Sequence, residues 1–237
     1  MKMKKHYRQF LLTALLFCVI FFPHSNALSQ GHSQKNLCPC KAEVKILIAA
    51  NDDSQIDSAD LYDEARNLYA ENRYDEVIRL LSGPCYRNST NIELNILLAK
   101  AQTEKCARLK EQGDKSYKKL IRQPYVTAVR LHKMTGMNPE LYYISARCLF
   151  INNRPSRAKR SIRKALYFKP GNPEYLVTLG DINISLANRA KRDGEDPVMY
   201  EDLYSNAKDA YQQALAAKRD DDAFVKRIEE KLKNLPK

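Results

Sequence analysis

Apolar residues recur at helical spacing through most of the chain, and short polar turns separate the stretches. In the segment 138–173, one apolar stripe consists of Tyr142, Ser145, Ala146 and Leu149, and a second consists of Ala158, Ile162 and Ala165. Asn152-Asn153 breaks the first stripe and Pro170-Gly171 ends the second. Asn138-Pro139 and Asn172-Pro173 are good helix starts, because Asn caps a helix and Pro is tolerated in its first turn. The segment predicts a helix, a tight turn and a second helix, and the pattern restarts at Asn172.

The same frame recurs before and after this segment. A first helix starting at Asp57-Ser58 carries Leu61, Ala65 and Leu68, and Asn72-Arg73-Tyr74 forms its turn. A second helix carries Val77 and Leu81, and Pro84 is expected to end it. The next first helix holds Asn95, Leu98 and Ala99, and a later one holds Leu176, Leu179 and Gly180. Its partner helix carries Ala207, Tyr211 and Ala214. Internal repetition of this kind is the signature of a repeat architecture.

Two of the four repeats are longer than this basic unit. The separations Ala65–Ala146, Ala99–Gly180 and Gly113–Gly194 are identical. We interpret this as a duplicated 81-residue module, in which each copy contains one plain and one extended repeat. The extension predicts a longer first helix followed by a loop at the glycine.

The repeat unit resembles the tetratricopeptide repeat. The family pattern places bulky and small residues in a fixed order, which is filled here by Tyr142, Ala146, Leu149, Ala158, Ile162, Ala165 and Pro170. The small residues let the paired helices approach closely, and the bulky residues fill the space toward the next helix. The resemblance implies an all-α fold, a right-handed α-solenoid of helix-turn-helix repeats. Residues 57–222 would form four such repeats, with repeats two and four extended.

Both ends of the repeat region have a predicted role. Residues 223–237 form an amphipathic capping helix with Phe224, Ile228, Leu232 and Leu235 on one face, which would cover the last repeat. Residues 28–56 would be a leader or N-terminal cap containing Cys38-Pro39-Cys40. Val44, Ile46 and Ile48 alternate there, which fits either a short strand or part of a capping helix.

The first 27 residues have the three-part pattern of a secretory signal. A basic segment precedes an apolar run from Phe10 to Phe22, and Ser25-Asn26-Ala27 offers small residues for cleavage. We therefore expect export to the periplasm or cell envelope. The alternative is an uncleaved segment that anchors the chain, and we expect membrane contact only in that case.

Cleavage would leave five cysteines, an odd number, in an oxidising compartment. Cys38 and Cys40 are too close for an easy mutual bridge, and either could reach Cys85. At least one thiol must stay free or pair between molecules. A metal site is not expected, because no second close Cys or His pair supplies the remaining ligands. We expect no cofactor and no catalytic residues: no Walker-type loop, H-E-x-x-H or G-x-S-x-G occurs.

The resemblance implies a concave groove lined by the first helix of every repeat. The outward positions on those helices are Tyr62, Arg66, Tyr69, Ile96, Lys100, Tyr143, Arg147, Phe150, Val177 and Asp181. Repeats one and three share an aromatic–Arg–aromatic triplet, and such residues often dominate protein interfaces. The groove would hold a peptide segment through aromatic contacts and through its acidic or C-terminal carboxylate groups. The alternative is that Tyr62 and Tyr143 pack against neighbouring helices while the arginines are solvated.

We therefore expect an exported scaffold or adaptor that binds a protein or peptide partner and is not an enzyme. The net charge of +12, or +8 after cleavage, suits an acidic or anionic partner, but a solvated basic surface is the more common reason for such a balance. One rival is a binder of an anionic polymer, which would use the basic insertion at residues 105–122, although we do not expect nucleic acid as the partner. Another is a redox or enzyme accessory subunit that uses Cys38 and Cys40.

Overall fold

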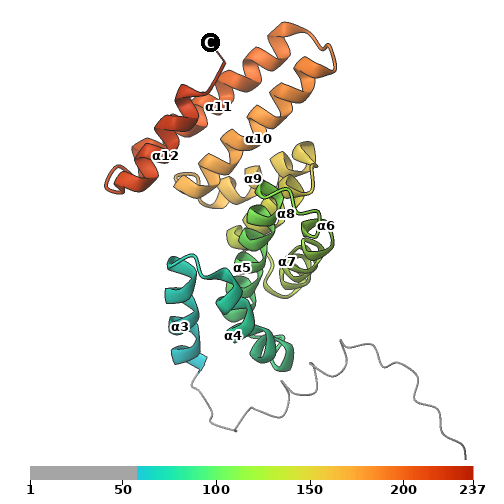
Figure 1. The fold of residues 1–237 in the computed structure, drawn as a ribbon, viewed down its shortest axis with the longest axis vertical. Helices are drawn as coiled ribbons and strands as arrows, with labels where there is room; N and C mark the ends of the chain where they lie inside the picture. Colours follow the sequence, from blue (N-terminus) through green and yellow to red (C-terminus); the bar gives the residue numbers. More distant parts are fainter. Residues whose placement is uncertain (1–57, 237) are drawn as a thin grey trace, which may run out of the picture. The chain divides into compact units, whose positions relative to one another are not determined.

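The computed structural model describes residues 58–236, all of it helices and turns without a strand (Figure 1). The first part of the repeat region consists of α3 (Ser58–Ala70), α4 (Tyr74–Arg87), α5 (Ile92–Glu111), α6 (Tyr117–Leu120) and α7 (Arg122–Thr135). Of these, α6 is a single helical turn. Five more follow: α8 (Pro139–Ile151), α9 (Pro155–Phe168), α10 (Pro173–Arg192), α11 (Pro197–Ala217) and α12 (Asp222–Lys233). The predicted all-α, helix-turn-helix architecture is confirmed over this range.

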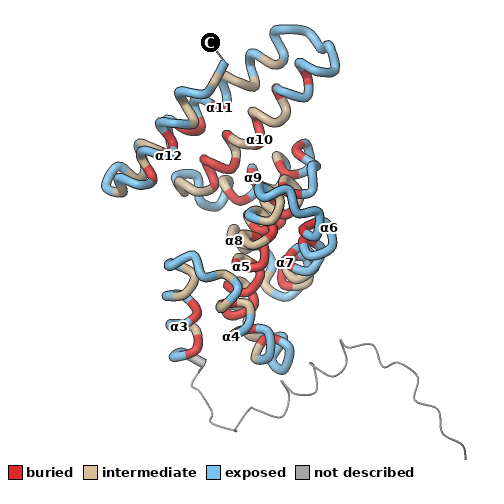
Figure 2. The backbone as a smooth tube through the Cα atoms, in the orientation of Figure 1, coloured by how far each residue is buried: buried red, intermediate tan, exposed pale blue. Residues whose placement is uncertain are grey.

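Each helix packs against the next, and successive first helices also touch. Contacts join α3 to α5, α5 to α8 and α8 to α10, so the first helices form a continuous row. Buried side chains follow this row as a series of clusters, each of which combines residues from two successive repeats or from the fourth repeat and α12. In Figure 2 the buried positions occupy much of α5. A repeat therefore hides its apolar face only against its neighbour, as expected for a solenoid.

The four first helices end in the same way. Each is followed by a residue with positive φ: Asn72, Gly113, Asn153 and Gly194, with φ of 60°, 78°, 56° and 72°. The N–H of the next residue donates to the carbonyl oxygen five residues earlier. Examples are Asp114 N to Leu109 O at 2.9 Å and Glu195 N to Ala190 O at 3.0 Å. This is the Schellman motif, which satisfies carbonyl groups at a helix end. Asn72 corresponds to Asn153 and Gly113 to Gly194 in the two modules, so the duplication is visible in the backbone.

The extended repeats follow the predicted form at their first helices. α5 and α10 both have 20 residues, against 13 in α3 and α8, and each ends just before its glycine. Their second helices differ, because α11 runs unbroken for 21 residues while the matching segment of the first module is divided into α6 and α7.

The expectation that Pro84 ends its helix is wrong. α4 continues to Arg87. Proline removes one N–H from the helix, but its own carbonyl still accepts from Asn88 N at 2.8 Å, and the added turn buries Cys85.

At the other end of the repeat region, α12 buries Phe224 and Ile228 in a cluster with residues of α10 and α11. The predicted signal segment 1–27, the predicted leader 28–56 and Cys38-Pro39-Cys40 lie outside the described residues. None of the described helices is long and apolar enough to cross a membrane.

Candidate functional site

The predicted groove positions come together in the middle of the row of first helices. Arg147 on α8 donates from Nη2 to Glu104 Oε2 on α5 at 2.7 Å, and from Nε to Oε1 at 3.3 Å. Both side chains are about four-fifths buried. Burial opposes the charge of Arg147, but the adjacent Glu104 and the hydrogen bonds to it raise the pKa of the guanidinium above its usual value. Sequence reasoning missed Glu104, which turns this arginine into a link between repeats two and three.

Two predicted tyrosines flank this ion pair. The ring of Tyr143 stacks on Tyr175 of α10 with centroids 4.8 Å apart, and the ring of Tyr69 lies 5.2 Å from that of Tyr74. Burial raises the pKa of both Tyr69 and Tyr143, and Glu104 raises both further. Tyr143 thus packs against a neighbouring helix, as one interpretation of the sequence held, but Arg147 is paired and not solvated.

The remaining predicted positions have mixed surroundings. Lys100 forms an ion pair with Glu140, which also accepts from Tyr175 OH at 2.7 Å. Val177 is buried, Tyr62 and Ile96 are half-buried, and Arg66 is exposed. The two triplets share a spacing, but their arginines differ in environment.

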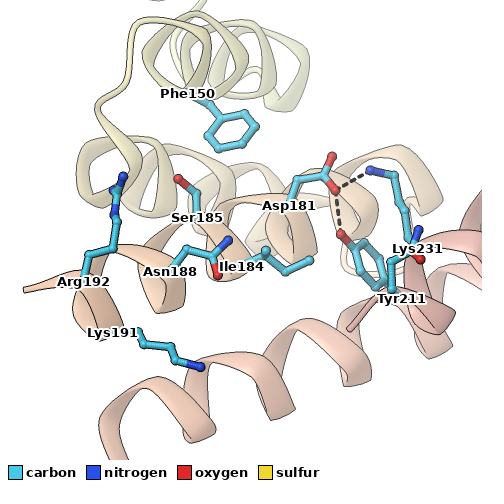
Figure 3. A pocket seen from close by; sticks show the side chains of 10 residues that line it. Phe150, Asp181, Ile184, Ser185, Asn188, Lys191, Arg192, Tyr211 and Lys231 are labelled. Carbon is cyan, nitrogen blue, oxygen red and sulfur yellow. Dashed lines mark hydrogen bonds and ion pairs between the residues drawn. The ribbon is translucent and has the colours of Figure 1, made fainter. Parts of the chain in front are cut away.

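Beyond this cluster the row of first helices opens into a cavity of about 920 Å³, called the α10 pocket below. Its lining comes from α8, α10, α11, α12 and the residue that follows α12: Phe150, Asp181, Ile184, Ser185, Asn188, Lys191, Arg192, Tyr211, Lys231 and Asn234. Phe150 faces Asp181 and Ser185 across the opening (Figure 3). Phe150 and Asp181 are predicted groove residues, whereas Lys231 belongs to the capping helix and was not foreseen as a lining residue.

Asp181 holds one wall of the α10 pocket in place. Its Oδ1 accepts from Tyr211 OH at 2.6 Å and from Lys231 Nζ at 2.7 Å (Figure 3). Asp181 is the only acid in the lining, and its carboxylate is therefore already bound within the protein. Lys191 and Arg192, in the last turn of α10, form no ion pair with any described residue, so the pocket lining has unbalanced positive charge.

Lys191 has a counterpart in the first module, Lys110, whose surroundings differ. Lys110 donates to Ile151 O at 2.9 Å and to Asn153 Oδ1 at 2.8 Å, so it binds the end of α8. Lys191 has no such bonds; its amino group lies 5.9 Å from the ring of Tyr200. The hydrogen bonds by which Lys110 binds the end of α8 therefore have no equivalent at Lys191.

Solved structures support the same architecture. A thermophilic TPR protein of Thermus thermophilus is similar over 81% of this chain and 90% of its own, with a TM-score of 0.57 and 15% identity. The chain has the tetratricopeptide repeat fold.

Two further solved structures are less similar. MamA aligns over 71% of this chain and 90% of its own, with a TM-score of 0.41 and 15% identity. The C-terminal part of a TPR repeat-containing protein from Cytophaga hutchinsonii aligns over 82% and 75%, with a TM-score of 0.43 and 12% identity. The sequence itself matches no family profile and no curated protein.

The first three basic residues of the basic insertion form contacts within this tetratricopeptide repeat fold. Lys105 pairs with Asp75, and Arg108 donates to Asn72 O at 3.0 Å while lying over the ring of Tyr74. Lys110 binds the end of α8, as described above. Half of the six basic residues from Lys105 to Lys119 thus hold neighbouring repeats together.

The cysteines of the described region are buried thiols. Cys85, Cys106 and Cys148 are each at most 5% exposed, and burial raises the pKa of Cys85 to about 11. The predicted bridge from Cys38 or Cys40 to Cys85 stays a prediction, because its other partner lies outside the described residues. In the range 58–236 no group of three or more His, Cys, Asp or Glu residues could hold a metal ion.

Proposed function

We propose that this protein is an exported binding scaffold whose α10 pocket holds an acidic peptide segment of a partner protein. The observation that carries the proposal is the unbalanced charge of the pocket, in which Lys191 and Arg192 have no acidic partner among the described residues while Asp181 is already bound twice.

The lining suits a short extended segment with mixed chemistry. Phe150 and Ile184 offer apolar contact, and the amide nitrogen of Asn188, whose Oδ1 accepts from Tyr204 OH, can donate to a carbonyl or carboxylate. An acidic side chain at the open end would meet Lys191 and Arg192. Arg can bind a carboxylate through two parallel hydrogen bonds, which gives direction as well as affinity.

Two features of the chain support a binding role. The row of first helices is cross-linked by paired side chains such as Arg147–Glu104, which preorganises the surface beside the pocket. The contact that Lys110 makes in the first module is missing at Lys191, so the second module presents a comparable lysine for an external group.

Export is the second part of the proposal and rests on the sequence of residues 1–27. We expect the mature chain to begin at Leu28 and to occur in the periplasm or cell envelope. Mass measurement of the protein recovered from an envelope fraction tests this, and a chain that still carries residues 1–27 would mean membrane anchoring instead.

Selection from a library of short random peptides tests the pocket. The wild type should enrich acidic peptides, and Lys191→Glu with Arg192→Glu should weaken the best of them by about tenfold or more. Lys208→Glu with Arg219→Glu is the matched control, because both residues are exposed and outside the pocket. Equal weakening by both pairs, or enrichment of basic peptides, would refute the pocket assignment.

A further inference from the structure

The positive charge of the chain is concentrated in its middle. Residues 115–173 contain 14 Lys and Arg and a single acid, Glu140. That acid is already engaged with Lys100, Tyr175 and Lys169. Of these cations, Arg147 pairs with Glu104 of α5 and Lys169 with Glu140, and the other twelve form no ion pair with any described residue, so an external anion is the natural counter-charge.

α9 arranges much of this charge on one face. Its buried stripe consists of Pro155, Ala158, Ile162 and Ala165. With 3.6 residues per turn, the opposite face carries Arg157, Arg160, Arg163, Lys164 and Tyr167, and all five are exposed. This set is called the α9 basic face below, and none of its residues lines the α10 pocket.

The cations of the α9 basic face have no acidic partners among the described residues. Lys164 has only a ring contact, with its amino group 5.5 Å from the centroid of Tyr142. Burial lowers the pKa of the neighbouring Lys159, and the charge of Arg163 lowers it further. Lys159 and Arg163 therefore oppose each other, whereas Lys105, Arg108 and Lys110 in the basic insertion each have an acidic or carbonyl partner.

Exposed apolar side chains lie at the C-terminal end of the same helix. Tyr167 is 82% exposed, and Phe168 at 38% stacks on Tyr142 with centroids 6.1 Å apart. Tyr142 also lies 4.2 Å from His132 of α7, so the ends of α7 and α9 meet there. Met137, which follows α7, is 73% exposed. Cations on the same helix as exposed aromatic side chains match the interfacial region of a membrane.

We propose that the α9 basic face binds the surface of an anionic phospholipid membrane. Its arginines and lysine would contact headgroup phosphates, and Tyr167 would enter the boundary between headgroups and acyl chains. A membrane is the occupant proposed here, because headgroup phosphates can take up the cations while the adjacent acyl boundary takes up the exposed Tyr167 ring. This contact is independent of residues 1–27, through which alone the sequence predicted membrane association.

Vesicle flotation of the full chain tests the electrostatic part. With phosphatidylcholine vesicles that contain phosphatidylglycerol, the triple variant Arg157→Gln, Arg160→Gln, Arg163→Gln should bind at least about tenfold more weakly than the wild type. The control Lys208→Gln, Arg219→Gln, Lys226→Gln removes the same charge elsewhere and should stay within about twofold. Residues 10–22 are unchanged in both variants, so they contribute equally to the vesicle binding of each. Equal losses in the two variants would overturn the proposal.

A fluorescent reporter at the helix tests the apolar part. The chain contains no Trp, so Tyr167→Trp introduces a unique probe. Its emission should shift to shorter wavelength with phosphatidylglycerol vesicles and be quenched by brominated acyl chains. RNA and polyglutamate at the same salt concentration should leave it unchanged. An unchanged emission with vesicles would contradict the proposal, and tighter binding to RNA or polyglutamate would assign the face to that partner instead.

Discussion

At the scale of single residues, the same side chain can be exposed in one module and bound in the other. Arg66 and Arg147 hold equivalent places in the duplicated modules, yet Arg66 is exposed and Arg147 is bound to Glu104. The sequence could predict that both arginines lie on first helices. It could not predict that only one of them has a carboxylate opposite, because that depends on how α5 and α8 are placed.

Arg147→Ala should lower the free energy of unfolding by about 2–3 kcal/mol, because Glu104 would be left unpaired in a largely buried place. Arg66→Ala is the control and should cost less than about 0.5 kcal/mol. Urea unfolding followed by circular dichroism measures both. Similar costs for the two substitutions would mean that the ion pair adds nothing to stability.

Gly180→Ala should destabilise the fold by about 1–3 kcal/mol through overpacking. A Cβ at this position would lie 2.8 Å from Cδ1 and 2.9 Å from Cζ of the fully buried Tyr211. Gly171→Ala is the matched control, because nothing lies within 4 Å of its added methyl group. Thermal unfolding compares the two, and a harmless Gly180→Ala would show that α10 and α11 are less tightly packed than described.

Glu140 should make stability depend on acid pH. Burial raises the pKa of its carboxyl group. The pKa is nevertheless lowered below 4.5, because Lys100 and Lys169 are positively charged and because Lys100 and Tyr175 donate hydrogen bonds to the carboxylate. A group with a lowered folded pKa contributes stability above its unfolded pKa and loses that contribution as the pH falls through the folded value. Wild-type stability should therefore fall below about pH 4.5, and Glu140→Gln should fall less steeply. Identical pH profiles would exclude this role.

At the scale of elements, helix ends are where the sequence was most informative. Asn caps at Asn138 and Asn172, and the glycines at the ends of α5 and α10, were predicted from residue type alone. Pro84 shows the limit of such rules. A proline marks a missing N–H, but whether the helix stops depends on what the next turn buries, here Cys85.

Gly113→Ala and Gly194→Ala should each cost about 1 kcal/mol and cost the same amount within error. Both glycines have positive φ, and no atom lies within 4 Å of an added Cβ, so the cost comes from the backbone alone. Chemical unfolding of the two variants provides the comparison. A clear difference between them would mean that the two helix ends are not equivalent.

At the scale of the whole molecule, the repeat unit and its duplication predicted the order of helices from residue 58 onward. The α10 pocket was not predictable, because it depends on how α12 lies beside α10 and on residues from helices far apart in sequence. The α9 basic face was not predictable for another reason. Both the insertion at 105–122 and α9 are rich in Lys and Arg, and only the structure separates bound cations from unpaired ones.

Ile228→Ala should weaken the C-terminal end selectively. Ile228 is fully buried in a cluster with α10 and α11, and loss of such a side chain costs about 2–4 kcal/mol. In a row of repeats stability is shared mainly between neighbours, so amide hydrogen exchange should accelerate in α10–α12 and change little in α3 and α4. Uniform acceleration would indicate a single cooperative unit.

The most direct test of the binding role is site-specific photo-crosslinking in the native envelope. A photoreactive residue in place of Ile184 lies in the α10 pocket, and one in place of Glu201 lies on the exposed side of α11. A discrete crosslinked partner is expected from position 184 only, and it should be lost with Lys191→Glu and Arg192→Glu but kept with Lys208→Glu and Arg219→Glu. The same product from both positions, or from neither, would contradict the binding role.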